Sequence, residues 1–227
     1  MPAPRLIAAL ALCGALTAPG NVAAYDDDPH AFRHVDPGDV DYYALVLSWS
    51  PTHCLSDRSD RDDMQCDPKR PDDFVLHGFW PQYAKGWPED CYAGKRPWVP
   101  SYVIREMRDI MPNKGLVIHE YKTHGTCSGL TPSAYFAMVR KAYDQVTIPT
   151  AFDAPDTQRF LSPENIEDEF IAANDWLKAD MITVSCRHGK LFDVRICFSD
   201  DLQPRACGAN FVQRRLCPLQ RVSVPAP

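Results

Sequence analysis

The residues best suited to chemistry in this chain lie in two short segments that carry histidines. The first is His77-Gly78-Phe79-Trp80-Pro81, and the second is the nine-residue run from His119 to Cys127. Imidazoles change charge near neutral pH, so two of them can divide the roles of general base and general acid. If the two segments face each other, they can act on a substrate that supplies its own nucleophile.

The second segment is predicted to be helical, because Leu116 to Cys127 carries apolar residues at helical spacing. Glu120 and His124 stand four residues apart, so on a helix they share a face and can hydrogen-bond. His119 lies one position round from Glu120. A carboxylate and two imidazoles are therefore expected to converge.

A zinc-dependent hydrolase built on His119, Glu120 and His124 is an alternative interpretation. The metalloprotease signature places its histidines four residues apart, whereas these are five apart and diverge by about 140° on an ideal helix. A second alternative is that these are buried, hydrogen-bonded histidines with no chemical role. We predict no metal and no other cofactor.

The flanking elements predict a single α+β domain, with a central antiparallel sheet covered by helices on one side. The expected strands are Tyr42–Trp49, Phe74–Phe79 stopped by Pro81, Met181–Cys186 and Leu191–Phe198, the last two joined by a hairpin turn. The expected helices are Val103–Met111, Leu116–Cys127, Ser133–Val146 after the Thr131 cap, and Glu164–Leu177.

The start of the chain reads as an export signal. Arg5, the apolar run Leu6 to Leu16 and the small residues Val22-Ala23-Ala24 predict a signal peptide at residues 1–24. The apolar run is too short to span a bilayer, and nothing later approaches the roughly 20 apolar residues that a membrane helix needs. We expect an arm over residues 25–41, a domain over residues 42–227, and a secreted or periplasmic protein.

Cysteine usage is typical of an oxidising compartment. Of nine cysteines, Cys13 lies in the predicted signal, which leaves eight to form four disulfides. Counting alone leaves 105 pairings open.

The chain is acidic, with a net charge of -6, so binding a polyanion would require local positive charge. The oligomeric state cannot be predicted.

The two histidine segments, in this order, resemble the active-site motifs of the ribonuclease T2 family. The resemblance extends to Tyr42–Trp49 with Cys54 and to the run Leu191–Cys197, so it covers nearly all of the mature chain. It implies a metal-independent endoribonuclease that cleaves single-stranded RNA. The ribose 2′-OH attacks the adjacent phosphate and a 2′,3′-cyclic phosphate is released, so DNA, which lacks the 2′-OH, would not be cleaved.

By the same resemblance, His124 is the expected general base and His77 the general acid that protonates the leaving 5′-oxygen. His119 is expected to bind the phosphate, and Glu120 to support the transition state. Trp80 is similar to the family residue that stacks on a nucleobase. Gln82 stands where some members carry an acidic group that contacts a base. Because an amide both donates and accepts, we expect broad base preference.

One position departs from the family pattern. Thr123 replaces the lysine that precedes the second histidine, and the nearest lysine, Lys122, points about 100° away around the helix. Either Lys122 reaches into the site or Thr123 serves as a weaker donor. The departure also keeps open a catalytically weak, secreted RNA-binding or signalling protein on the same fold.

The resemblance also suggests which cysteines pair. It implies disulfides between Cys91 and Cys127, Cys186 and Cys217, and Cys197 and Cys207, which leaves Cys54 with Cys66.

Overall fold

The computed structural model describes residues 38–55, 65–67, 73–92, 94, 97–153 and 155–227, together with Met1. The predicted signal peptide and most of the predicted arm lie outside the described residues. The last part of the arm is joined to the domain, because Gly38 N–H donates to the Cys127 carbonyl and Asp41 N–H donates to the Gln82 carbonyl. In the described part of the chain, none of the helices combines the length and apolar character that a membrane crossing requires.

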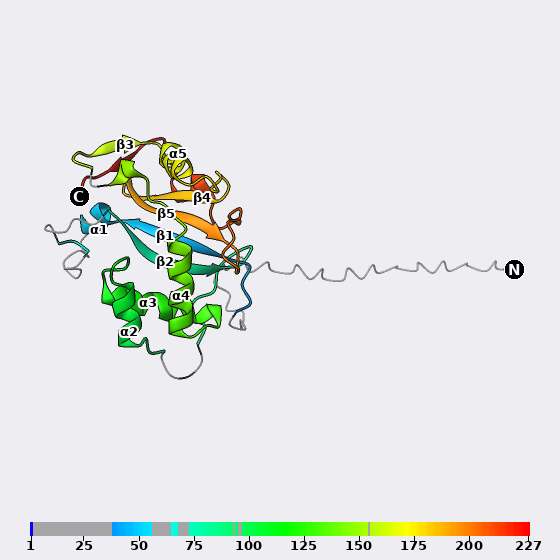
Figure 1. Cartoon of the computed structure of the whole chain (residues 1–227). Helices are drawn as coiled ribbons and strands as arrows, with labels where there is room; N and C mark the ends of the chain where they lie inside the picture. Colours follow the sequence, from blue (N-terminus) through cyan, green and yellow to red (C-terminus); the bar gives the residue numbers. More distant parts are fainter. Residues whose placement is uncertain (2–37, 56–64, 68–72, 93, 95–96, 154) are drawn as a thin grey trace. The chain divides into compact units, whose positions relative to one another are not determined.

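A single six-stranded sheet organises the described residues, in the order β2-β1-β5-β6-β3 with β4 paired to β5 (Figure 1). The strands are β1 Tyr42–Trp49, β2 Phe74–Gln82, β3 Arg159–Leu161, β4 Ile182–Arg187, β5 Lys190–Phe198 and β6 Val222–Val224. The predicted α+β class is confirmed. The sheet is antiparallel except where β5 meets β6, and the two three-residue strands β3 and β6 were not predicted from the sequence.

Six α-helices surround the sheet within the described residues: α1 Ser50–Cys54, α2 Ser101–Met107, α3 Lys114–Thr123, α4 Pro132–Tyr143, α5 Pro163–Ala173 and α6 Gln213–Leu216. Figure 1 shows α2, α3 and α4 on the β2 side and α5 beside β4. The expected Thr131 cap is present, and Ser162 caps α5 in the same way. Thr131 Oγ1 accepts from Ala134 N–H, and Ser162 Oγ accepts from Asn165 N–H.

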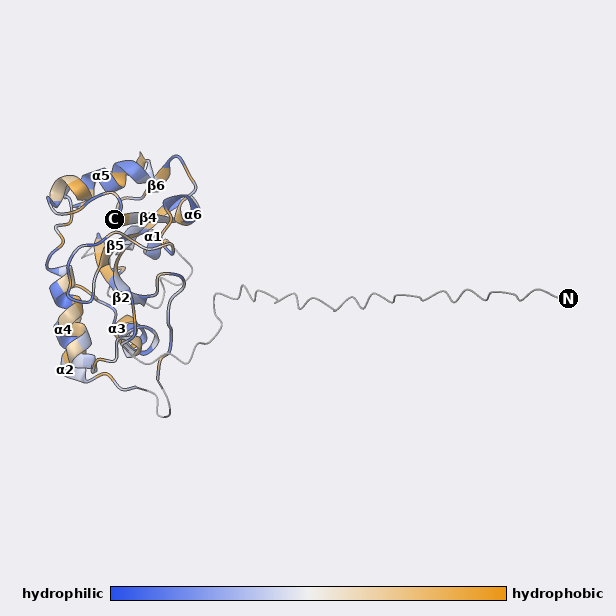
Figure 2. Ribbon diagram, turned by 90° about the vertical axis from the view of Figure 1, so that its right-hand side faces the viewer, coloured by the Kyte–Doolittle hydropathy of each residue, from blue (hydrophilic) through white to orange (hydrophobic). Residues whose placement is uncertain are grey.

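The central strand β1 is buried on both faces, and its alternating side chains separate two apolar clusters. Leu45 and Leu47 belong to the larger cluster, to which α2, α3, α4 and α5 contribute. Ala44 and Val46 belong to a smaller cluster on the opposite face, where Trp80 packs. Hydrophobic and hydrophilic residues alternate along α4 and α5 in Figure 2, as expected of helices that cover a core.

Two predicted boundaries near the histidine segments are wrong, each for a physical reason. Pro81 does not stop β2, which continues to Gln82. Proline is tolerated there because β2 is an edge strand, so its backbone makes no hydrogen bond to another strand on its outer side. The helix predicted to reach Cys127 ends at Thr123, with His124 as its C-cap and a 3₁₀ turn over Gly125–Ser128.

Four disulfides stabilise the fold, and they join the same pairs that the family resemblance implies: Cys54–Cys66, Cys91–Cys127, Cys186–Cys217 and Cys197–Cys207. The Cys91–Cys127 bridge ties the segment after β2 to the 3₁₀ turn after α3. It therefore links covalently the region after the first histidine segment to the end of the second.

A buried hydrogen bond also connects α4 to the strand that carries the first histidine segment. The hydroxyl of Tyr135 donates to the Phe79 carbonyl at 2.7 Å. We predict that Tyr135→Phe lowers the free energy of unfolding by about 1–3 kcal/mol, because the buried carbonyl loses its donor. Urea unfolding monitored by tryptophan fluorescence measures the change.

Tyr102→Phe is the matched control. Its hydroxyl bonds to Ser133 at an exposed position, so its removal should change stability by less than about 0.5 kcal/mol. Equal effects of the two substitutions would contradict a special role for the buried bond.

Candidate active site

His77 enters the site at an irregularity in the pairing of β1 with β2. Val46 pairs with Gly78 and Leu47 pairs with Leu76, so His77 is an extra residue in β2. Such a bulge re-aims a side chain out of the regular alternation. The imidazole Nδ1 lies 2.9 Å from Ser48 Oγ. This contact orients the ring and leaves Nε2 facing α3.

The glycine after His77 allows α3 to approach the strand edge. A Cβ at Gly78 would overlap the carboxylate of Glu120 and the indole nitrogen of Trp80. Only a residue without a side chain leaves space for this carboxylate. The second residue of the first motif is therefore required by the position of the second motif.

Glu120 is buried between these two elements. Its Oε2 accepts a hydrogen bond from Trp80 Nε1 at 2.8 Å, and its Oε1 lies 3.5 Å from His77 Nε2. Burial raises the pKa of Glu120 to about 8, and burial lowers the pKa of His77 to about 4. Near neutral pH the Glu120 carboxyl is therefore protonated and the His77 imidazole is neutral, so the pair carries no net charge.

His124 lies directly after α3, on the other side of the indole. Its ring centroid is 5.2 Å from that of Trp80 and 6.5 Å from that of His119. Its Nδ1 is buried and has no hydrogen-bond partner among the residues that the structure describes. Burial, followed by the neighbouring His119 and His77, lowers the pKa of His124 to about 3. This imidazole is therefore neutral and able to accept a proton, while His119 is exposed beside it.

The structure thus brings together His77, Glu120, His124, His119 and Trp80, but it pairs them differently from the sequence prediction. Glu120 was expected to bond to His124 on one helix face. Instead its two oxygens meet Trp80 and His77. The reason is that α3 ends at Thr123, so the Glu120 side chain is directed at β2 and His124 leaves the helical path.

Sequence reasoning missed a polar layer beneath the cluster. Arg195 lies 5.2 Å from the centroid of the Trp80 ring and is held by Asp193 at 2.8 Å. Asp193 is buried and stands opposite Ser48 in the sheet. The sequence did contain a signal for this layer. Ser48, Asp193 and Arg195 are polar residues in otherwise apolar strands, and their spacing places them on one face of the sheet.

Gln82 is not brought to the histidines. Its side chain is buried, where its Nε2 donates to the Pro81 carbonyl and its Oε1 accepts from Asn210. Asn210 also donates to the carbonyls of Tyr83 and Gly86. The amide of Gln82 therefore belongs to a network that fixes the loop after β2, which leaves it poorly placed to contact a base.

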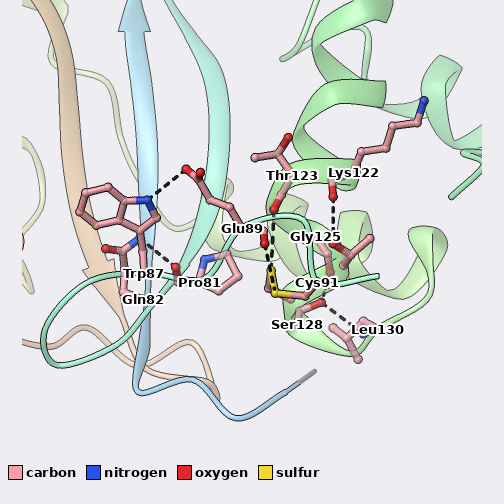
Figure 3. The surroundings of a disulfide bond; sticks show 12 residues. Pro81, Gln82, Trp87, Glu89, Cys91, Lys122, Thr123, Gly125, Ser128 and Leu130 are labelled. Carbon is pink, nitrogen blue, oxygen red and sulfur yellow. Dashed lines mark hydrogen bonds between the residues drawn. A yellow bond between two sulfur atoms is a disulfide. The ribbon is translucent and has the colours of Figure 1, made fainter. Parts of the chain in front are cut away.

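Lys122 and Thr123 point to different sides of α3. Figure 3 shows the Lys122 side chain extending away from the Cys91–Cys127 disulfide, with Thr123 directed to the opposite side. The Thr123 carbonyl accepts from Asp90 N–H at 2.8 Å. Lys122 lines a groove with Trp98 on the outer face of α3. Of the two alternatives that the sequence left open, this placement favours Thr123 as the weaker donor over Lys122.

Within the described ranges, no group of three or more histidine, cysteine, aspartate or glutamate residues is arranged to hold a metal ion. The charged segment from Arg58 to Arg70, in which four basic and four acidic residues balance, falls almost entirely outside those ranges.

Comparison with known proteins identifies the class to which this fold and this site belong. Residues 40–207 match the Ribonuclease T2 family. This match covers well over half of the chain, so the protein belongs to the ribonuclease T2 family.

Several relatives carry ribonuclease names. A ribonuclease of Aeromonas hydrophila is 45% identical over 96 residues, which cover 42% of this chain and 41% of that protein. A probable ribonuclease of Haemophilus influenzae is 32% identical, with 48% and 44% covered. These alignments span less than half the length of either relative. Ribonuclease DdI of Dictyostelium discoideum is 28% identical over 91% of this chain and 96% of its own length.

Solved structures share the fold. Trichomaglin, described as an S-like ribonuclease, superposes with a TM-score of 0.65 and 23% identity, covering 83% of this chain and all of its own. An RNase-related protein from Calystegia sepium superposes with a TM-score of 0.63 and 22% identity, covering 82% and 97%.

The buried carboxyl at the centre of the site leads to a prediction about stability. Because the pKa of Glu120 is raised in the folded state, the unfolded chain loses this proton first as the pH rises above the ordinary glutamate pKa. Stability therefore falls as the pH approaches about 8. Glu120→Gln removes this penalty, so it should gain about 1–3 kcal/mol relative to wild type between about pH 4 and pH 8.

Urea unfolding of both proteins at the two pH values measures the difference. The exposed Glu169→Gln serves as control and should show no such pH-dependent gain. If the difference between Glu120→Gln and wild type is the same at both pH values, the carboxyl is not buried in the way described.

Proposed function

We propose that this protein is an endoribonuclease that cleaves single-stranded RNA by transphosphorylation, without a metal or other cofactor. The observation that carries the proposal is the convergence of three imidazoles and one buried carboxyl around Trp80, from two separated segments. Membership of the ribonuclease T2 family supports the same conclusion.

In the proposed reaction, neutral His124 takes the proton of the ribose 2′-OH, and the 2′-oxygen attacks the adjacent phosphorus. The bond from phosphorus to the 5′-oxygen breaks, and His77 gives a proton to that oxygen. A 2′,3′-cyclic phosphate remains. Proton transfer by a placed side chain typically contributes about 10²- to 10⁴-fold in rate.

The neutral Glu120–His77 pair suits the role of acid. An anionic phosphodiester in front of the ring favours the imidazolium, so the proton held by the pair moves to His77 as the carboxylate forms behind it. Glu120 Oε1 faces His77 and has no hydrogen-bond partner in the described structure. Exposed His119 is placed to bind a phosphate oxygen.

Base recognition rests on Trp80 in this proposal. Its indole is partly exposed and rigidly held, with its nitrogen bonded to Glu120 and Arg195 beside its ring. Stacking tolerates any base, and the amide of Gln82 is already engaged. We therefore propose broad base preference, with no cleavage of DNA.

We further propose that the chain is exported, after removal of residues 1–24, to the periplasm or the medium. Four disulfides are consistent with an oxidising compartment. The domain is then residues 42–227, preceded by the arm.

A catalytically weak RNA-binding or signalling protein is the second candidate. The observation in its favour is the placement of Lys122 outside the cluster, which leaves Thr123 in the position of the family lysine.

The catalytic proposal predicts RNA digestion in EDTA at about pH 5, below the ordinary histidine pKa. Products should carry 2′,3′-cyclic phosphate ends, detected by mass spectrometry. His77→Ala and His124→Ala should each lower the rate by at least about 10²-fold, with unchanged thermal melting. The control is His188→Asn, at the exposed hairpin turn between β4 and β5.

Three outcomes separate the candidates. Intact RNA with retained RNA binding supports the weak relative. Digestion that EDTA abolishes supports a metal-dependent hydrolase. Near wild-type rates in either histidine variant would refute the assigned roles.

Thr123 provides a separate prediction. A lysine side chain at this position would restore a cation aimed at developing charge, so Thr123→Lys should raise kcat by about tenfold or more. Thr123→Gln has similar reach without charge and should not raise it. An unchanged rate for Thr123→Lys would mean that another group already stabilises the transition state.

A further inference from the structure

The outer face of α3 forms one side of a groove that the proposed reaction does not use. Its lining includes Trp98, Val99, Ile104, Lys114, Ile118 and Lys122, and its volume is about 180 Å³. We call this surface the Trp98 groove. Val99 and Ile104 are buried and form its floor, whereas Trp98 and Lys114 are exposed.

Trp98 is the most solvent-exposed aromatic side chain of the described residues, with 73% of its surface accessible. A single exposed apolar residue carries no functional meaning by itself. Here the indole borders a groove that also holds two ammonium groups. An exposed ring beside cations is the combination that single-stranded nucleic acids use for stacking and for backbone contacts.

The charge of the groove contrasts with that of the chain. Lys114, Ile118 and Lys122 follow one another at four-residue steps and so line one face of α3. The groove lining contains both lysines and no carboxylate, although the whole chain has a net charge of -6. A polyanion is therefore the ligand that this surface favours.

The groove and the histidine cluster both draw residues from α3. Exposed His119 follows Ile118 directly and stands three residues before Lys122, so the two side chains are neighbours on the helix surface. An RNA strand with a phosphate at His119 would therefore have Lys122, at the edge of the groove, beside it.

We propose that the Trp98 groove binds nucleotides of the same RNA strand that flank the cleavage point. Trp98 stacks on a base, and Lys114 and Lys122 contact backbone phosphates. The inference rests on the proposed function, which it extends from one phosphodiester to a strand. It also gives Lys122 a role at a position where it cannot replace the missing active-site lysine.

Binding of non-cleavable 2′-O-methyl oligonucleotides, measured by fluorescence anisotropy, tests the groove. The two probes are a dinucleotide and a strand of about eight nucleotides, within the usual site size of single-strand binders. Trp98→Ala should weaken binding of the longer strand by about tenfold and leave that of the dinucleotide unchanged.

Lys114→Ala gives a second readout, the salt dependence of RNA binding, which would not change if Lys114 had only a structural role. For the longer strand, the slope of log affinity against log salt should become shallower by about 0.7, the value for one phosphate contact on a single strand. Phe160→Ala and Lys141→Ala are matched controls. Phe160 is 54% exposed on β3, and Lys141 is an exposed lysine of α4; both should leave affinity and slope unchanged.

The outcomes separate this inference from the proposed function. If Trp98→Ala weakens binding of both oligonucleotides equally, or of neither, the proposal that the groove binds RNA is wrong even if the protein cleaves RNA. Loss confined to the longer strand supports the groove, and it does so even if the wild-type protein fails to cleave RNA in the EDTA assay. In that case only the catalytic proposal is lost.

Discussion

The site depends on one buried carboxyl. Glu120 lies between α3 and β2, where Trp80 Nε1 donates to one oxygen and His77 faces the other. This packing is possible only because Gly78 has no Cβ. Burying a carboxylate would be costly, so the group keeps its proton near neutral pH and the pair with His77 stays uncharged. In the proposed reaction, this uncharged pair supplies the proton of the general acid when the anionic phosphodiester binds.

The two faces of the sheet differ in what packs against them, and this difference supports the site. One face of β1 packs into the large core with helices α2 to α5, and the other carries the small cluster and the polar layer. The bulge at His77 turns its ring to the second face, above Ser48. Asp193 holds Arg195 next to Trp80. A rigid, fully buried core on one side thus allows charged and polar groups to be held in place on the other.

The order of Lys122 and Thr123 shows how strongly a helix converts sequence position into spatial direction. An offset of one residue moves a side chain about 100° around the axis. Lys122 consequently lines the Trp98 groove rather than the histidine cluster. The lysine ammonium is therefore absent from the position of the family lysine. It lies instead in the groove that we propose for the neighbouring nucleotides of the RNA. A weaker active site and a longer RNA-binding surface, as we propose them, would both follow from the position of this lysine one residue earlier on α3.

The sequence by itself determined the α+β class, the limits of β1, the capped starts of α4 and α5, and the two histidine segments, because these depend on local periodicity, capping and motif spacing. It did not determine that Glu120 pairs with His77 and Trp80 instead of His124, that Gln82 is engaged by Asn210, or that β2 continues through Pro81. Those features arise from contacts between segments distant in the chain. Edge position, the end of α3 and the space left by Gly78 decide them, and none of these is encoded in the spacing of neighbouring residues.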